Sequence, residues 1–487
     1  MNKFNPFFSK VKKKTLISIL LFSLLVRLMY FSFHHPLWWD AHIYIGMAKY
    51  MFSGGNIGIW ESFRPLLHPI ILGFFWILKL NIIIIGKLLD LIFSLLSVYF
   101  TYLIGKKIFN EKTGLIAAAI FSLTPLFLML TGMILTEPLA ILLSLLGVYL
   151  FLDRDKKMKI FLAGLLIALS FMSKFPQGII FAALSLVIIL DQKTFWIKIK
   201  QLLLFGLGFS IPVLAFLIFN YFTYGDFLQP FTAGAWIVTT STWVYGQGKL
   251  FYFFNFFLRN WIYLFFFASL YYYFKEKEWK NPNKNILFFT FLLFFFYFSL
   301  VVPRKEVRYL VTALPFIALI ISQTILMIYN KLKSSPQPLI RPTAFIIICV
   351  LTTVIFIPTS LSFEVVPTFD QEIKDVIEEY NIEGIILTSD PSLVSSLNHE
   401  IVILSAGMDY GPIIYQNVKQ DYEMIFINDC DFICSPQDQV CFSERQKFLE
   451  LIEEENIEIF KETATIKKKE CNYTLYLKPE VLEKNEN

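Results

Sequence analysis

The sequence predicts an α-helical polytopic membrane protein with a small α/β domain at its C-terminal end. Of 487 residues, 56% are hydrophobic and only 17% are charged, whereas soluble domains carry about a quarter of charged residues. Apolar stretches long enough to span a bilayer recur along the chain. Residues 1–361 hold 33 basic and 12 acidic residues, whereas residues 362–487 hold 10 and 26. We therefore expect a basic transmembrane domain over 1–361 and an acidic α/β domain over 362–487.

The first apolar stretch, 15–33, predicts a retained helix. It is long for the apolar region of a signal peptide, and bulky residues follow it where a cleavage site would need small ones (His34, His35 and Pro36). About eleven spans are expected in all: 15–33, 84–105, 114–132, 134–152, 159–173, 175–190, 201–222, 258–274, 285–302, 308–329 and 343–361. A further apolar segment, 66–80, is short and suits an interfacial helix better than a span.

Lysine and arginine placement predicts the orientation, because cytoplasmic loops are enriched in these residues. If 66–80 is not a span and the N-terminus is cytoplasmic, most basic residues fall in inside loops. The odd number of spans then places the acidic C-terminal domain outside the cytoplasm. The same topology makes 34–83 one large outside loop, in a multi-pass protein of the cell membrane.

The C-terminal part contains four of the five cysteines, Cys430, Cys434, Cys441 and Cys471. An even number in a small extracytoplasmic domain predicts two disulfides, with three pairings open. A zinc site is the alternative, although no Cys-x-x-Cys pair or nearby histidine favours it. Hydrophobic patterning predicts helices over 369–380 and 443–455 and strands over 384–388, 400–404, 422–428 and 473–477.

The first outside loop contains a candidate catalytic carboxylate, Asp40. Tyr44, Ala48 and Phe52 follow it at helical spacing, so Asp40 is expected at or near the start of a helix on the membrane surface. An ordinary N-cap is the alternative role for this residue.

A second outside cluster, Arg304-Lys305-Glu306-Val307-Arg308-Tyr309, precedes the tenth predicted span. At helical spacing Arg304 and Arg308 would share a face. Cations at headgroup depth suit a lipid phosphate, and snorkelling to lipid headgroups is the alternative. Glu137 and Lys174 are weaker candidates, since a first-turn acid and a turn lysine are ordinary features.

Several motifs occur in an order that resembles the GT-C-type membrane glycosyltransferases, in particular the protein-mannosyltransferase and aminoarabinose-transferase superfamily. The motifs are Arg27, Trp39-Asp40-Ala41-His42-Ile43-Tyr44, Gly54-Gly55, Arg64-Pro65 with Pro69, Thr136-Glu137-Pro138, Ser173-Lys174-Phe175, and the segment 304–309 followed by Leu314-Pro315. One departure is Ala41, because protein O-mannosyltransferases usually have Glu after the first-loop Asp.

The resemblance implies transfer of a sugar, a hexose such as mannose, from a polyprenyl or dolichyl phosphate to an extracytoplasmic glycan, lipid or protein. Asp40 would be the general base, with inversion at the anomeric carbon. The donor phosphate is assigned to Arg64, Lys305 and Arg308. Binding of donor or acceptor is assigned to Tyr44, Glu137, Lys174, Glu306 and Tyr309.

Such a displacement requires no cofactor, although the first-loop histidines are alternative ligands for a divalent metal (His34, His35, His42 and His68). Nucleic acid is not expected as a partner. The main alternative function is a transporter or flippase of a lipid-linked substrate. We favour an enzyme because no internal repeat is evident and the polar residues gather in outside loops.

Overall fold

The structure is a computed structural model that describes residues 6–32, 37–240, 246–258, 260–335, 341–342, 344–345, 348–349, 352, 369–404, 411–434, 437–466 and 469–486. Most of the predicted span 343–361 therefore lies outside the described residues. The chain divides into two compact units. The first comprises 1–34, 62–68 and 87–362, and the second comprises 35–61, 69–86 and 363–487. The sequence predicts a single boundary after residue 361. The second unit differs from the predicted C-terminal domain in that it also includes two segments of the first outside loop, 35–61 and 69–86.

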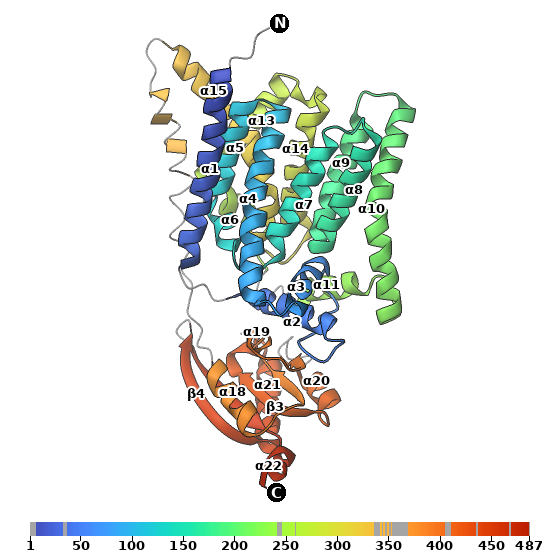
Figure 1. Ribbon diagram of the computed structural model, residues 1–487, viewed down its shortest axis with the longest axis vertical. Coiled ribbons are helices and arrows are strands. Elements are labelled where there is room, and N and C mark those ends of the chain that lie inside the picture. The colour runs from blue at the N-terminus through green and yellow to red at the C-terminus, as the bar shows by residue number, and fades with distance from the viewer. Residues whose placement is uncertain are drawn as a thin grey trace. The chain divides into compact units, whose positions relative to one another are not determined.

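The first unit is a helical bundle, and its long helices run along a common direction (Figure 1). Helix α8 packs between α7 and α10, while α15 packs on α5, α13 and α14. The helices are α1 (Pro6–Ser32), α4 (Ile82–Ile108), α5 (Glu111–Leu123), α6 (Pro125–Leu130), α7 (Thr136–Phe151), α8 (Lys157–Ser173), α9 (Gly178–Leu190), α10 (Phe195–Tyr224), α11 (Gln229–Thr240), α13 (Phe265–Lys275), α14 (Pro282–Phe296) and α15 (Leu314–Ser334).

Short helices of other types connect these elements. The 3-10 helices are η1 (Phe175–Gln177), η3 (Trp261–Leu264), η4 (Glu278–Lys280) and η6 (Val307–Ala313), and the π-helices are η2 (Phe253–Leu258) and η5 (Tyr297–Val301).

Five helical segments within the described residues are long and apolar enough to cross a membrane. They are Lys14–Phe31, Ile82–Ile108, Phe195–Tyr224, Pro282–Val301 and Val307–Ser334. The expected count of eleven spans is therefore not confirmed. Shorter apolar helices occupy the predicted spans 134–152 and 175–190. Helix α3 (Leu67–Ile77) has 11 residues and would reach about 16 Å, which is too short for the hydrocarbon core. Its length agrees with leaving 66–80 out of the spans.

The predicted span 114–132 is not one continuous helix, because it consists of two helices separated at Thr124. Helix α5 ends at Leu123, and Pro125 begins α6. A proline disfavours helical backbone at the residue before it, and Thr124 accordingly has ψ 119°.

The second unit contains a five-stranded sheet in the order β2-β1-β3-β5-β4. Its strands are β1 (Ile385–Thr388), β2 (Ile401–Ile403), β3 (Tyr422–Asn428), β4 (Ile457–Ile466) and β5 (Lys469–Leu477). Strand β1 pairs in parallel with β2 and β3, whereas β5 is antiparallel to β3 and β4. Its helices are α2 (Trp39–Phe52), α3, α18 (Asp370–Glu379), α19 (Leu393–Ser396), α20 (Gly411–Val418), α21 (Gln439–Glu455) and α22 (Pro479–Glu486), with the 3-10 turn η7 (Asp429–Asp431).

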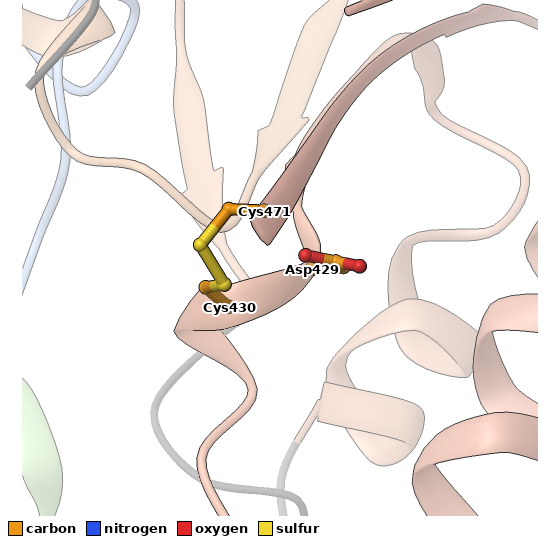
Figure 2. Close-up of side chains that lie close together, drawn as sticks. All are labelled: Asp429, Cys430 and Cys471. Carbon is orange, nitrogen blue, oxygen red and sulfur yellow. A yellow bond between two sulfur atoms is a disulfide. The ribbon is translucent and has the colours of Figure 1, made fainter. Parts of the chain in front are cut away.

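Two disulfides, Cys430–Cys471 and Cys434–Cys441, confirm the expected use of the four C-terminal cysteines. Figure 2 shows the first disulfide beside Asp429. These three residues are also the group in the described chain that is spaced to hold a metal ion. Both sulfur atoms are consumed by the disulfide, and the Asp429 carboxylate accepts hydrogen bonds from the backbone and side chain of Asn472, each at 3.0 Å. The zinc alternative has no thiolate left to coordinate the ion.

Candidate functional site

The Glu306 carboxylate gathers three side chains in the first unit. Arg304 Nε and Arg308 Nε each donate to it at 2.6 Å, and Tyr309 Oη donates at 2.9 Å. The side chains of Arg304, Glu306 and Arg308 are 16–18% exposed. Charge-assisted bonds of this length fix the guanidinium groups in place while leaving them partly accessible.

The local backbone differs from the helix expected over this segment. The π-helix η5 ends at Val301, Arg304 forms an antiparallel bridge with Gly246, and Glu306 has extended backbone at φ −131° and ψ 136°. A 3-10 helix then begins at Val307. In extended backbone the residues i and i+2 share a face, so Arg304 and Glu306 lie together and Lys305 points elsewhere. The expectation that helical spacing aligns Arg304 with Arg308 is therefore wrong, although both do bind Glu306.

Lys305 is 6% exposed and caps the end of η5. Its ammonium group donates to the carbonyl oxygens of Ser299 (2.9 Å), Phe298 and Val302. Burial, followed by the nearby charge of Lys249, lowers the pKa of Lys305. Because an ammonium has three donors, these carbonyls occupy all of them in this conformation. Lys305 thus holds the backbone of the cluster instead of offering its charge to a ligand.

Tyr252 supports the same segment and was not anticipated from the sequence. Its hydroxyl donates to the Glu306 carbonyl at 3.0 Å and accepts from the Glu306 amide at 3.2 Å. The residue lies in a run of phenylalanines and is 1% exposed. The aromatic run shows no polar pattern that would have singled out Tyr252.

A second ion pair joins Glu137 at the start of α7 to Lys174 after α8, at 2.5 Å. Glu137 is 2% exposed, and Arg308 attracts its carboxylate electrostatically. Gln177 connects α7 to η6. Its side-chain amide donates to Thr312 Oγ1 of η6 at 2.9 Å and accepts from Ser144 Oγ of α7 at 3.2 Å. The structure therefore brings five predicted site residues into one neighbourhood: Glu137, Lys174, Glu306, Arg308 and Tyr309.

Asp90 of α4 is a buried acid that sequence reasoning missed. Its Oδ2 accepts from the amides of Gly132 (3.2 Å) and Ile134 (2.8 Å), and the residue is 0% exposed. Both of those turn residues have positive φ, 88° and 57°. An acidic residue inside a predicted span is itself a functional signal, and it could have been noticed. Asp90 fixes the turn from which α7 and Glu137 begin.

The cluster carries more positive than negative charge. Arg304, Arg308 and Lys174 pair with two carboxylates, those of Glu306 and Glu137, and the ammonium of Lys305 is bound to backbone carbonyls of the same segment. These six side chains have a formal excess of two positive charges. Burial opposes ionisation of Glu306, but the adjacent Arg308 and Arg304 bring its pKa below the ordinary value. An anion with two negative charges would balance the excess.

An open cleft of about 470 Å³ borders this cluster. It is lined by the segments 246–249 and 299–303 together with Lys305. The lining includes the apolar residues Leu300, Val301 and Val302 as well as Lys249, so it suits a molecule with an apolar and an anionic part.

Three further predicted site residues, Arg64, Asp40 and Tyr44, belong to the segment 34–83. The Arg64 guanidinium carbon is 5.0 Å from the centroid of the Phe63 ring in the first unit. Asp40 is the second residue of α2 in the second unit, where Tyr44 is also buried. The expected helix after Asp40 is confirmed.

Two solved protein structures resemble this architecture. Over 94% of the chain and 97% of the other protein, the structure superposes on ArnT from Cupriavidus metallidurans bound to undecaprenyl phosphate, with a TM-score of 0.63 and 10% identity. The archaeal oligosaccharyltransferase AglB from Archaeoglobus fulgidus, in complex with an inhibitory peptide and a dolichol-phosphate, gives a TM-score of 0.55 and 12% identity. That match covers 94% of this chain and 74% of AglB.

The chain has the GT-C glycosyltransferase fold. Residues 64–219 also match the family model of dolichyl-phosphate-mannose-protein mannosyltransferase. This matched part of the GT-C fold contains Arg64, Glu137 and Lys174. No curated protein sequence is significantly similar to the chain.

Proposed function

We propose that this protein is a membrane glycosyltransferase that moves a sugar from a polyprenyl phosphate to an extracytoplasmic acceptor. The supporting observation is the partly buried cationic cluster around Glu306 and Glu137 in a GT-C fold. A sugar phosphodiester becomes a phosphate monoester when the sugar leaves, and the monoester carries close to two negative charges. The cluster's formal excess of two positive charges favours the leaving group over the bound donor, which is the requirement for catalysis.

In the proposed reaction, an acceptor oxygen attacks the anomeric carbon and the bond from that carbon to the phosphate oxygen breaks. The electron pair leaves with the polyprenyl phosphate, and the acceptor proton passes to the carboxylate of Asp40. Because a single displacement occurs, the configuration at the anomeric carbon inverts. The fixed cations supply stabilisation without needing a metal ion, since they already offset the developing phosphate charge.

Within this proposal Arg308 is the principal phosphate ligand, with Arg304 beside it and Glu306 holding both in place. Lys174, oriented by Glu137, adds a further cation, and Arg64 is proposed as another donor contact. Lys305 acts on the phosphate indirectly by holding the segment. Tyr44, Glu137 and Tyr309 are proposed to contact donor or acceptor.

The sugar is proposed to be a hexose, and mannose has the support of the matching family description. The solved relatives support a lipid phosphate donor, because ArnT is bound to undecaprenyl phosphate and AglB to a dolichol-phosphate. The acceptor is proposed to be a glycan, lipid or protein of the cell envelope.

The deciding experiment is transfer from labelled polyprenyl-phosphate hexoses in membranes containing either the wild-type chain or Asp40→Asn. Loss of a general base costs about 10²–10⁴ in rate, and we expect a loss in that range without loss of folded protein. Glu61→Gln is the matched control, since it removes another carboxylate from the same loop. Full activity of Asp40→Asn would exclude Asp40 as the base. Movement of the labelled lipid across the bilayer without sugar transfer would instead favour a flippase.

A further inference from the structure

Helix α2, which carries Asp40, is joined to the C-terminal part of the chain by a buried lysine. Lys49 is 3% exposed. Its ammonium donates to the carbonyl oxygens of Val394 at 2.8 Å and Leu397 at 2.7 Å, with Ser395 O at 3.4 Å. All of these acceptors lie in or just after α19.

These hydrogen bonds provide partners both for the carbonyl groups of α19 and for the buried Lys49 ammonium. A one-turn helix such as α19 leaves carbonyl groups without partners at its C-terminal end, and a cation there is favourable. A buried ammonium is costly unless it is hydrogen-bonded. Removing Lys49 would leave the carbonyls unpaired, whereas separating α2 from α19 would leave the ammonium unpaired.

Two other contacts join the same segments. The Gly58 amide donates to His399 O and the Gly58 carbonyl accepts from the Ile401 amide, both at 2.8 Å, so Gly58 forms an isolated parallel bridge with Glu400, the residue before β2. His42 Nδ1 lies 2.6 Å from Ser395 Oγ.

Two glycines allow this close approach. A Cβ on Gly46 would lie 2.3 Å from Val394 Cγ1, and a Cβ on Gly58 would lie 2.2 Å from Gly46 O. Gly58 also has φ +99°, which disfavours any residue with a side chain.

We propose that the C-terminal α/β domain serves as a positioning element of the active site, with Lys49 as the positioning residue that fixes α2 and therefore Asp40. The inference rests on the proposed role of Asp40. Asp40 and Lys49 lie on one continuous helix of 14 residues, so a displacement at Lys49 is carried to Asp40. A misplacement of about 1 Å costs on the order of 10² in rate.

The test uses the full chain in detergent or nanodiscs and compares Lys49→Met with Lys447→Met, which removes an exposed lysine from α21. Hydrogen exchange of residues 54–60 and 397–402 should accelerate at least tenfold in Lys49→Met, while exchange in β3 and β5 stays unchanged. The kcat for sugar transfer should fall by about 10² with the donor KM unchanged. Lys49→Arg should restore part of both properties, and Lys447→Met should match the wild type.

Unchanged exchange at 54–60 in Lys49→Met would overturn the proposal, and so would faster exchange with an unaltered kcat. Faster exchange throughout β3 and β5 would indicate loss of general stability and would also count against positioning. If Lys49→Met fails to fold, Ser395→Ala removes only the His42 contact and should give smaller changes of the same kind. A wild-type chain without transfer activity would refute the proposed function, while the exchange measurements would still decide whether Lys49 holds α2.

Discussion

In this proposal, binding of the donor phosphate depends more on Arg308 than on any other residue. Glu306 accepts from its Nε at 2.6 Å, which sets the plane of the guanidinium. A planar fork binds phosphate through paired hydrogen bonds, whereas lysine provides a point charge. We expect about a tenfold loss of kcat in Arg308→Lys and a loss of about 10²–10³ in Arg308→Gln. Steady-state transfer assays with Arg304→Lys as comparison would check this. Equal activity of Arg308→Lys and the wild type would show that the fork is unimportant.

Asp431 gives the second unit a predictable response to pH. Burial first, and then the neighbouring carboxylate of Asp390, raises the pKa of Asp431 to about 8, while an unfolded aspartate titrates near about 3.9. Between these values the folded state holds a proton that the unfolded state lacks, so stability falls as pH rises from about 4 to about 8.

Asp431→Asn should remove this loss, because the amide oxygen can still accept the 3.2 Å hydrogen bond from Ser389 Oγ. The melting temperature of the full chain in detergent should then rise by a few degrees at pH 8 and vary less between pH 5 and 8. Asp375→Asn, on the exposed side of α18, should keep the wild-type slope. A wild-type slope in Asp431→Asn would contradict the assignment.

Single residues also show where sequence reasoning reached its limit. Lys174 and Arg308 were predicted as site residues because Lys and Arg are unusual in outside loops, and Glu137 and Glu306 were predicted as the charged residues of the same loops. The role of Lys305 was not foreseen, because it depends on a π-helix whose last carbonyls need donors. No sequence pattern distinguishes a lysine that caps such a helix from one that binds a phosphate.

Among the elements, the turn between α6 and α7 links membrane packing to the candidate site. Asp90 Oδ2 holds the amides of Gly132 and Ile134, and Glu137 follows within one turn of α7. Asp90→Leu removes both acceptor interactions, whereas Asp90→Asn keeps an acceptor oxygen. We expect Asp90→Leu to reduce transfer at least tenfold by freeing this turn, and Asp90→Asn to retain most of the activity.

Steady-state kinetics together with the yield of folded protein would separate positioning from instability. Thr101→Val, which removes another buried polar group from α4, is the matched control. A similar loss of activity in this control would mean that Asp90 has no special link to Glu137.

The boundaries of helices and strands were predictable where the hydrophobic pattern of neighbouring residues determines them. The helix over 369–380 and the strands near 384, 400 and 422 match α18, β1, β2 and β3. Strand β4 was not predicted, because Glu458, Lys461 and Glu462 occupy an exposed edge strand and leave little apolar alternation. Thr124 and Pro125 marked the break between α5 and α6, but the apolar run on either side concealed it.

For the whole molecule, composition predicted the membrane part and the acidic α/β part, but it could not group residues 35–61 and 69–86 with the latter. That grouping depends on contacts such as those of Lys49 with α19, more than 340 positions away in sequence. Local periodicity carries no information about such pairings, so they emerge only from the folded chain.

Several predicted cytoplasmic loops meet in the first unit. Lys107 pairs with Asp153 at 2.8 Å. Arg154 pairs with Asp191 at 2.9 Å and donates to Asn283 at 2.7 Å. These contacts join the last turn of α4, the loops before α8 and α10, and the first turn of α14. The loops that lysine placement assigns to one side are thus neighbours at one end of the bundle, as a shared side of the membrane requires.

Which side that is remains a prediction with a direct test. The basic residues of these loops favour the cytoplasm, and the two disulfides favour an oxidising compartment for the C-terminal domain. Alkaline phosphatase fused after Asn110 should be inactive and a fluorescent protein there should fluoresce, while phosphatase fused at the C-terminus should be active. The reverse pattern would place the loops around Asn110 outside the cytoplasm. It would then put the 304–309 cluster on the cytoplasmic side, so that an extracytoplasmic acceptor would no longer reach the proposed phosphate site.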